Sequence, residues 1–425
     1  MNDLTTDDPR YRELFDPAKE AQASSGMVVP DLTPAMCALR ERGPVLPGSL
    51  RQLLNLPALH HGFDRERPHY TIFSYAACER AFRENMVFSS EVYKESPGVR
   101  MLGNTILQMV GREHREQRGV VQPMFVLPTV MEVWKKNWID EAVDTLVERF
   151  VGRDSAELNL ELCARLPLYV VTRGMGLRGD EALNFREQLL QSSILSRKDP
   201  QAALRAAAEV SSILKRLIEA RRARPSDDVV SSLIQNDVRL SEGGTRKLSD
   251  EEIFSHCRLI ILAGGGTTWR QLGITLHALL THYELWRACC AEPKLIEASV
   301  EEAARWRPTD PTFPRLVQRD VEVEGVPIAA GSRVDLCLGA ANRDPARWKD
   351  PDVFDIYRPK QAHLAFGQGP HQCLGINVAR QEMITAIAAL MQRFPNMKLD
   401  ANAPEPQLVG GLEQRGVTAL PVRLS

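Results

Sequence analysis

Residues 363–394 read HLAFGQGPHQCLGINVARQEMITAIAALMQRF, a glycine-rich loop with one cysteine followed by a helical pattern. After the loop, apolar side chains recur at helical spacing, at Ile376, Ala379, Met383, Ile387 and Leu390. Cys373 therefore lies just before or at a helix N-terminus, where backbone N–H groups and the helix dipole favour an anion. This cysteine is the best thiolate candidate in the chain.

The glycines around this cysteine indicate close contact with another group. Gly367, Gly369 and Gly375 suit a tight loop whose backbone passes near a flat group and donates N–H bonds to the sulfur. A zinc site at His371 and Cys373 is not favoured, because no second ligand pair with metal spacing appears in the sequence. A dinucleotide loop is not favoured either, because the third glycine of its motif and a βαβ context are missing. The remaining alternative is a buried structural cysteine before a helix.

A second glycine-rich stretch, LIILAGGGTTWRQLG at 259–273, interrupts an apolar helical pattern. Each glycine costs about 1 kcal/mol relative to alanine inside a helix, so three in a row suggest that something approaches the backbone closely. Ser249 and Glu252 form a capping box, and the run to about His282 predicts a central helix about 50 Å long. A core helix with small residues for close helix packing explains the pattern equally well at this point.

Composition narrows the class of protein. The 425 residues are 44% hydrophobic, and 53 Lys and Arg nearly balance 55 Asp and Glu. The net charge therefore does not indicate binding to a nucleic acid or to a membrane surface. The eight cysteines do not form a disulfide scaffold and suit a reducing compartment. The N-terminus is polar and acidic, and no apolar run reaches membrane-spanning length. We therefore expect a cytoplasmic protein with no membrane anchor and no nucleic-acid partner.

Patterning along the chain predicts a mainly α protein with a small β portion. No repeat or flexible linker is visible, so we expect a single domain over residues 1–425, with residues 1–30 loosely ordered. Helical patterning dominates from about 130 to 305. Strand-like text is confined to 69–74 and 320–338, where Glu-Gly at 324–325 and Ala-Gly at 330–331 predict hairpin turns.

The segment FGQGPHQCLG at 366–375 resembles the haem-binding signature of the cytochrome P450 family, the haem-thiolate monooxygenases, at every fixed position of Phe-Gly-x-Gly-x-His-x-Cys-x-Gly. The resemblance implies the cytochrome P450 fold, with the long central helix passing over haem b (iron protoporphyrin IX). By the same resemblance Cys373 is the axial ligand of the haem iron and His371 contacts a haem propionate. Phe366 packs beside the sulfur, and Gly367 belongs to the haem-binding loop.

A Glu-x-x-Arg pair supports the same family. EEAAR at 301–305 places Glu302 and Arg305 one turn apart on a helix face. Alone, such a pair is usually a solvated ion pair of little energetic value. The resemblance implies a buried structural network instead, completed by Arg358 of FDIYR at 354–358.

Two further segments resemble haem-propionate clamps. GREHREQR at 111–118 places His114 and Arg118 one turn apart, so both can face the same anionic group. FPRLVQRD at 313–320 places Arg315 just before the first of the later strands, where the family usually has a propionate arginine. Without the cysteine loop, each would be an ordinary surface cation.

The resemblance also gives the central glycines a function. Residues 263–268 would cross the distal face of the haem and leave room for dioxygen and substrate. The family pattern there is Ala/Gly-Gly-x-acid-Thr, so Gly264 and Thr267 match while Gly266 replaces the acid. The Thr267 hydroxyl would hold the proximal proton chain, with ordered water beside Gly266 replacing the carboxylate. The structural alternative is a Thr267 hydroxyl bonded back to the carbonyl of Ala263.

These features favour a monooxygenase that inserts one atom of O2 into a C–H bond of a small to medium lipophilic substrate. We expect electrons from a ferredoxin and its NAD(P)H-dependent reductase, since no dinucleotide or flavin segment is visible. Arg112 and Arg115 are candidate contacts for this acidic partner, or ordinary exposed charges. We expect a monomer. The alternatives are a peroxygenase or nitric-oxide-reductase-like enzyme, suggested by Gly266, and a non-enzymatic haem sensor or carrier.

The substrate pocket should be mostly apolar. Family position points to residues that could equally belong to the core: Met101, Leu102, Leu262, Ala263, Thr309, Phe313 and Leu412.

Overall fold

The computed structural model describes residues 8–19, 28–57, 67–194 and 199–425. The α-helices are α2 (Arg10–Leu14), α4 (Thr33–Arg42), α5 (Leu50–Leu53), α6 (Tyr75–Arg83), α7 (Pro97–Arg100), α8 (Gly111–Val121), α9 (Leu127–Thr129), α10 (Asp140–Glu148), α11 (Arg165–Gly174), α12 (Asp180–Ile194), α13 (Pro200–Ala223), α14 (Val229–Gln235), α15 (Asp250–Thr281), α16 (Tyr283–Ala291), α17 (Leu295–Trp306), α18 (Leu338–Ala341) and α19 (Ile376–Arg393). Short 3-10 helices cover Ser90–Glu95, Gln122–Met124 and Gly369–His371, and wider π-type turns cover Val130–Ile139 and Asn159–Cys163.

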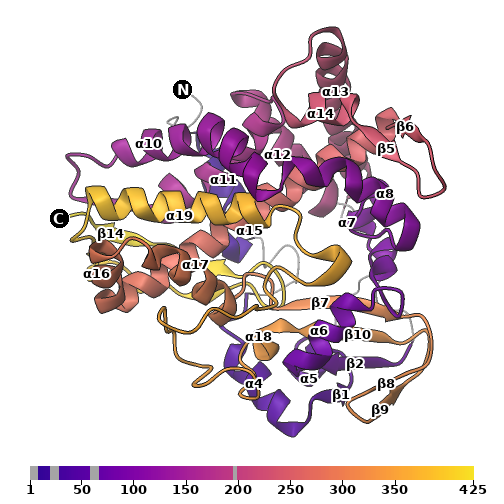
Figure 1. Ribbon diagram of the computed structural model, residues 1–425. Coiled ribbons are helices and arrows are strands. Elements are labelled where there is room, and N and C mark those ends of the chain that lie inside the picture. Colours follow the sequence, from indigo (N-terminus) through magenta and orange to yellow (C-terminus); the bar gives the residue numbers. More distant parts are fainter. Residues whose placement is uncertain (1–7, 20–27, 58–66, 195–198) are drawn as a thin grey trace.

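The strands are short and gather mostly in one small sheet. They are β1 (Val45–Pro47), β2 (His69–Ile72), β3 (Phe88–Ser89), β4 (Ser155–Glu157), β5 (Asp237–Arg239), β6 (Thr245–Lys247), β7 (Thr312–Val317), β8 (Val321–Val323), β9 (Val326–Ile328), β10 (Arg333–Cys337), β11 (Lys398–Leu399), β12 (Leu408–Val409), β13 (Gly416–Val417) and β14 (Pro421–Arg423). Figure 1 shows the five-stranded sheet β1-β2-β10-β7-β3 at one end of the molecule, next to α4, α5, α6 and α18, and most of the longer helices at the other. The prediction of a mainly α fold with a small β portion is confirmed.

Helix α15 forms the centre of the helical part, and its start is the one that the sequence predicts. The Ser249 side chain accepts the N–H of Glu252, and the Glu252 carboxylate accepts the N–H of Ser249 at 2.8 Å. The helix continues for 32 residues to Thr281, which at the usual rise is about 50 Å. It is buried nearly all round, and in Figure 1 it runs behind α19. Its apolar composition thus reflects a helix that crosses the core.

Only one of the two expected hairpins forms. Strands β8 and β9 pair across Glu324 (φ 51°) and Gly325 (φ 78°), the left-handed turn that a two-residue hairpin favours. The hairpin expected at 330–331 is wrong, because β10 pairs with β7 and β2 rather than with β9. The N–H of Gly331 donates to the carbonyl of Val317 at 2.8 Å, so this turn returns the chain to β7.

The N-terminal segment is partly packed into the helical core. Tyr11 and Phe15 are buried, and Phe15 meets the ring of Trp269 edge-on at 5.6 Å between centroids. The guanidinium of Arg186 in α12 lies 4.3 Å from the Phe15 ring, a buried cation–π contact. Residues 8–19 are therefore packed rather than loosely ordered, while 1–7 and 20–27, also part of that expectation, lie outside the described residues.

No helix among the described residues is both long enough and apolar enough to cross a membrane.

The cap of α15 generates the first prediction. Ser249→Ala removes the side-chain acceptor for the N–H of Glu252, so we expect a loss of about 1 kcal/mol in the free energy of unfolding, measured with urea. Ser155→Ala, a change at the exposed start of β4, is the control and should have an effect within about 0.5 kcal/mol. Equal effects of the two substitutions would contradict this role for the cap.

Candidate functional site

The cysteine loop precedes α19 and closes tightly on α6. The N–H of Cys373 donates to the carbonyl of Phe366 at 2.8 Å, which joins the two ends of the loop. Gly369 has a φ of 67°, and a Cβ there would lie 2.8 Å from the carbonyl oxygen of Phe82. Only glycine fits that position without moving backbone. The loop therefore depends on its contact with α6 as well as on its own sequence.

Burial and the neighbouring polar groups have opposite effects on the pKa of Cys373. Burial raises the pKa of the thiol, while the N–H of Gly375 and the charges of Arg118 and Arg380 lower it. The side chain is nevertheless exposed to solvent. Both observations agree if the sulfur lies deep among protein atoms and faces an internal hollow. Donors and cations around such a sulfur favour the thiolate, which is the form that binds a metal.

Two histidines stack beside the loop, and only one has its ring nitrogens engaged. The rings of His114 in α8 and His371 lie 4.2 Å apart. His371 Nε2 is 3.1 Å from Ser90 Oγ, and the backbone of Ile106 also bonds the ring. In the described residues, the buried Nε2 of His114 has no hydrogen-bond partner. Burial also lowers the pKa of His114 to about 4, so its ring is neutral near pH 7.

Two arginines approach the same region from different elements. Arg118 in α8 donates to the carbonyl of Gln372 at 2.7 Å, next to the cysteine. Arg315 in β7 lies with its guanidinium carbon 5.0 Å from the centre of the Phe82 ring and bonds Tyr93. Its Nε is buried and has no hydrogen-bond partner among the residues described. Unpaired buried donors of this kind indicate an acceptor that belongs to a bound group.

The three central glycines of α15 have different surroundings. A Cβ at Gly264 would lie 3.1 Å from Val171, and one at Gly265 would lie 2.9 Å from Arg186, so both glycines serve helix packing. At Gly266 a Cβ would meet nothing within 4 Å. The expectation that all three open room toward the haem is therefore wrong for Gly264 and Gly265, because their Cα atoms face α11 and α12.

The solvent exposure of residues in the middle of α15 indicates a hollow beside this helix. Ala263 is exposed although it lies in the middle of the helix, where Ile261 and Trp269 are fully buried. Thr267, one turn on, is half-buried, and its hydroxyl donates to the carbonyl of Ala263 at 3.1 Å. An exposed residue in a buried helix must border an internal space. Together with the exposed Cys373 sulfur and the unpaired donors near its loop, this space fits a flat group with anionic arms.

Comparison with known proteins identifies the family. The sequence profile described as Cytochrome P450 matches residues 182–417. The steroid C26-monooxygenase of Mycobacterium tuberculosis is 30% identical over 82% of this chain and 94% of its own length. The chain belongs to the cytochrome P450 family.

Solved structures of this family share the fold of this P450. The crystal structure of P450BioI, in complex with an acyl carrier protein ligated to hexadec-9Z-enoic acid, has a TM-score of 0.80 at 27% identity and covers 93% of this chain and 99% of its own. CYP109E1 from Bacillus megaterium, in complex with testosterone, has a TM-score of 0.77 at 26% identity with the same coverage. The P450 is a haem-thiolate monooxygenase, and members of its family bind haem b through a cysteine thiolate.

The structure brings Glu302, Arg305 and Arg358 together in a buried network. Arg305 donates two hydrogen bonds of 2.7 Å to the carboxylate of Glu302, and Arg358 Nε lies 3.3 Å from the same carboxylate. Further N–H groups of Arg305 donate to the carbonyls of Asn342 and Pro351. This network of the P450 joins α17 to the long segment that leads into the cysteine loop.

The expected pocket residues have mixed surroundings. Leu102 and Leu412 are buried in apolar clusters, and the N–H and hydroxyl of Thr309 bond Gln271 and Arg415. Phe313 packs edge-on against another ring, 6.2 Å between centroids. Met101 and Leu262 are half-buried, and Ala263 is the one residue of the seven that is exposed.

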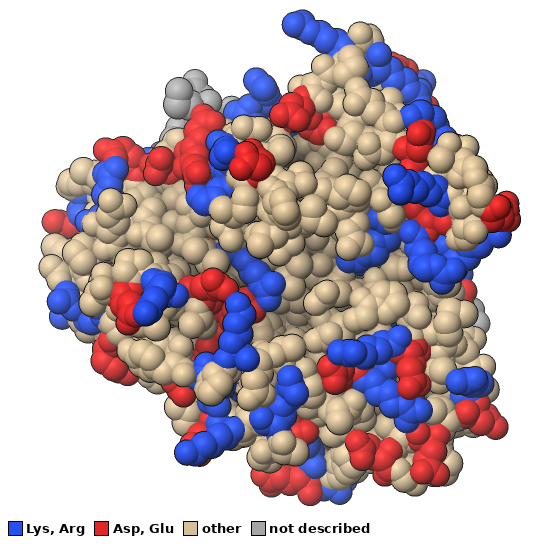
Figure 2. All heavy atoms as spheres, viewed as in Figure 1, with Lys and Arg blue, Asp and Glu red and all other residues tan. Residues whose placement is uncertain are grey.

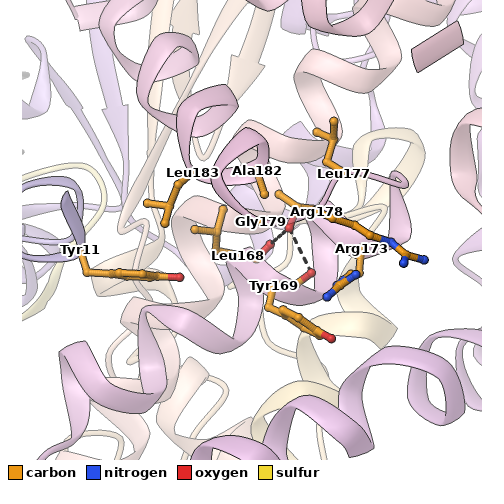
Figure 3. A pocket seen from close by; sticks show the side chains of 10 residues that line it. Tyr11, Leu168, Tyr169, Arg173, Leu177, Arg178, Gly179, Ala182 and Leu183 are labelled. Atoms are coloured by element: carbon orange, nitrogen blue, oxygen red, sulfur yellow. Dashed lines mark hydrogen bonds between the residues drawn. The ribbon is translucent and has the colours of Figure 1, made fainter. Parts of the chain in front are cut away.

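Two other hollows are unsuited to a lipophilic substrate. A cavity of about 20 Å³ lies between α2, α11 and α12, lined by Tyr11, Leu168, Tyr169, Arg173 and Leu183 (Figure 3). It has room for about one water molecule. A surface hollow of about 540 Å³ is lined largely by charged side chains, among them Glu297, Lys360 and Arg380. The first is too small for a substrate, and the charged lining of the second does not suit a lipophilic one.

The site also contains residues that sequence reasoning missed. Arg380 donates two hydrogen bonds to Glu301, at 2.7 and 2.6 Å, and stacks on Phe366. Ser90 and Tyr93 reach His371 and Arg315 from the Ser90–Glu95 turn. Arg380 follows Cys373 by two turns, a spacing that could have indicated it. No local signal marks Ser90 or Tyr93.

The buried network generates the second prediction. Arg305→Met leaves the buried Glu302 carboxylate without its main partner, so we expect a loss of about 3–5 kcal/mol in the free energy of unfolding, measured with urea. Arg393→Met breaks the exposed ion pair with Glu148 and should cost less than about 1 kcal/mol. Similar losses for the two variants would argue against a structural network at Glu302.

Proposed function

We propose that Cys373 is the haem-iron ligand of this P450, and that the enzyme inserts one atom of O2 into a C–H bond of a small to medium lipophilic substrate. The observation that carries this proposal is the sulfur itself: it receives the N–H of Gly375, lies near two arginines and faces a hollow. When bound, the haem supplies the iron at which dioxygen is reduced and cleaved. We further propose that residues 1–425 form one catalytic domain, with 366–375 as its haem-thiolate loop.

His114, Arg118 and Arg315 are the residues we assign to the haem propionates. The unpaired Nε2 of His114 and Nε of Arg315 can each donate a hydrogen bond to a carboxylate. Arg118 already lies beside the loop. His371 has protein partners at its ring, so its role is to fix the loop against Ser90 and Ile106. Phe366 and Gly367 shape the backbone around the sulfur.

Thr267 is the residue we assign to proton transfer at the distal side. Its hydroxyl donates to Ala263, the contact expected of a purely structural threonine, but its lone pairs can still accept a hydrogen bond from water. Gly266 leaves room for that water. Gly264 packs against Val171 and has no part in this step.

The proposed substrate class is supported by the relatives. The related monooxygenase named above acts on a steroid, and two structural neighbours hold testosterone and a fatty acyl group. Steroids and fatty acids are therefore the compounds to screen, by the spectral shift of the haem protein on binding and by analysis of products.

Electron supply is proposed to come from a ferredoxin and its NAD(P)H-dependent reductase. Figure 2 shows Lys and Arg side chains over α8 on the face where α19 lies, with Asp and Glu beside them. Arg112 already pairs with Glu116 and Glu242, at 3.2 and 2.7 Å, so it is not a free contact for a partner. The exposed Arg115 remains the candidate for an acidic partner.

The ligand assignment generates the third prediction. Cys373→Ser should abolish the long-wavelength absorption band that reduced thiolate-ligated haem gives with carbon monoxide, because the hydroxyl of serine stays protonated near pH 7. Cys290→Ser, at a half-buried cysteine in α16, is the matched control and should keep the band. A Cys373→Ser protein that keeps the band would overturn the assignment.

The role of Thr267 generates the fourth prediction. With a ferredoxin system and a compound from the screen, Thr267→Ala should raise the hydrogen peroxide formed per product molecule by roughly tenfold or more, because the proton-holding hydroxyl is lost. Thr268→Ala, at a buried neighbour on the same helix, is the control. An enzyme that makes product with peroxide alone but never with O2 and ferredoxin would favour the peroxygenase alternative.

A further inference from the structure

Two polar side chains pack on the aromatic ring at which the cysteine loop begins. The guanidinium carbon of Arg380 lies 5.3 Å from the centre of the Phe366 ring, and the ring of His363 lies 5.9 Å from it between centroids. The carbonyl of Phe366 accepts the N–H of Cys373 at 2.8 Å. Side chains that hold this ring therefore also hold the backbone of the cysteine.

Glu301 in α17 contacts both of these side chains. Its two carboxylate oxygens accept Nε and Nη2 of Arg380 at 2.7 and 2.6 Å, and Nε2 of His363 lies 3.4 Å from its Oε2. The N–H of Ala365 donates to Nδ1 of His363 at 3.2 Å, so the proton of the neutral ring lies on Nε2, toward Glu301. One carboxylate thus joins a residue before the loop to a residue of α19, and α17 packs beside α19 (Figure 1).

The position of Arg380 depends on this carboxylate. Burial acts to raise the pKa of Glu301, but hydrogen bonds from His363 and Arg380 lower it to about 2, so the group is ionised near pH 7. A bidentate pair between an arginine and a carboxylate fixes the orientation of both groups. The Arg380 side chain is 32% exposed and borders the surface hollow of about 540 Å³. Without Glu301 it has room to turn away from Phe366.

The contacts of Arg380 lead to the sulfur by two short routes. One passes through the Phe366 ring and the carbonyl that bonds Cys373. The other follows the backbone, because the carbonyl of Gly375 accepts the N–H of Ala379, the residue before Arg380, at 2.9 Å. A cation held near a thiolate stabilises negative charge on the sulfur and on the iron that it binds. Such charge favours the reduced state of the iron.

We propose that Glu301 is a positioning residue that holds Arg380 against Phe366 and thereby raises the reduction potential of the bound haem. The inference rests on the proposed function of Cys373 as the iron ligand. In the step concerned, one electron passes from reduced ferredoxin, which is thereby oxidised, to the haem iron, and neither a proton nor a chemical group is transferred. The ligated iron carries one more negative charge after this step, and the guanidinium stabilises that charge.

A redox titration of the holoenzyme, followed by absorbance and without substrate or turnover, tests the first part of this proposal. Arg380→Gln removes the cation. We expect the equilibrium between oxidised and reduced haem to shift about tenfold toward the oxidised form, a fall of about 59 mV in the potential of this one-electron couple. Arg393→Gln is the matched control, because Arg393 lies on the same helix and pairs with Glu148 at 2.8 Å. It should leave the potential unchanged.

Variants of Glu301 distinguish holding Arg380 from acting only as a charge. The amide in Glu301→Gln has one acceptor oxygen in place of two, so Arg380 loses its bidentate partner and the potential should fall toward that of Arg380→Gln. A carboxylate that acts only through its own negative charge predicts the opposite, a rise in potential when the charge is removed. Glu301→Asp keeps the charge but is shorter by one methylene, and we expect it to lower the potential as well.

A double variant completes the test. If Glu301 acts through Arg380, the potential of Glu301→Gln in the Arg380→Gln background should equal that of Arg380→Gln alone. The band of the reduced protein with carbon monoxide should persist in every variant, which shows that the thiolate ligand is in place.

The possible results separate this inference from the proposed function. A potential that rises or stays unchanged in Glu301→Gln overturns the inference, and so does a double variant in which the two effects add. If Glu301→Gln binds no haem, Glu301→Asp gives the decision in the same way. A parent protein that lacks the carbon monoxide band contradicts the assignment of Cys373, whereas a parent with the band and variants with unshifted potentials contradicts only the role of Glu301.

Discussion

The environment of the Cys373 sulfur is the constraint on which the rest of the structure depends. Burial alone would keep the thiol protonated, and a protonated thiol is a poor metal ligand. The N–H of Gly375 and the charges of Arg118 and Arg380 act in the other direction. These groups come from the loop, from α8 and from α19. The helical part of the fold therefore serves to hold three separate elements around one atom.

The loop can do this only because distant parts of the chain hold it in place. Gly369 lies against the backbone of α6, and Arg118 bonds the carbonyl next to the cysteine. Behind the loop, Arg305 and Glu302 are fully paired inside the protein and bond the segment that precedes it. Such a buried pair adds little net stability compared with apolar packing. Its effect here is to fix the path of the chain between α17 and the loop.

The distal side combines familiar and altered features. Thr267 is present and faces the hollow, but the acid that usually precedes it is replaced by Gly266. Arg270 donates a hydrogen bond to the carbonyl of Gly266, so its side chain returns along the helix.

Local pattern was enough for much of the fold and part of the site. The capping box at Ser249, the length of α15, the turn at Glu324-Gly325 and the pairing of Glu302 with Arg305 all depend on residues a few positions apart. The cysteine loop and the helix after it were likewise predicted from residues close together in the chain. The sequence by itself therefore determined where the central helix begins, where the cysteine loop lies and which family the chain resembles. Regular backbone geometry fixes which residues a few positions apart can interact, so these features can be predicted without a structure.

Only the tertiary structure decided which surface each residue faces. Gly264 and Gly266 are alike in sequence, yet one packs on Val171 and the other borders open space. The strand after Gly331 pairs with β7 instead of β9, although local sequence does not indicate this pairing. These outcomes depend on contacts between segments that are far apart in the chain. The physical reason is that packing and burial are shared properties of several elements, so no single stretch of sequence contains them.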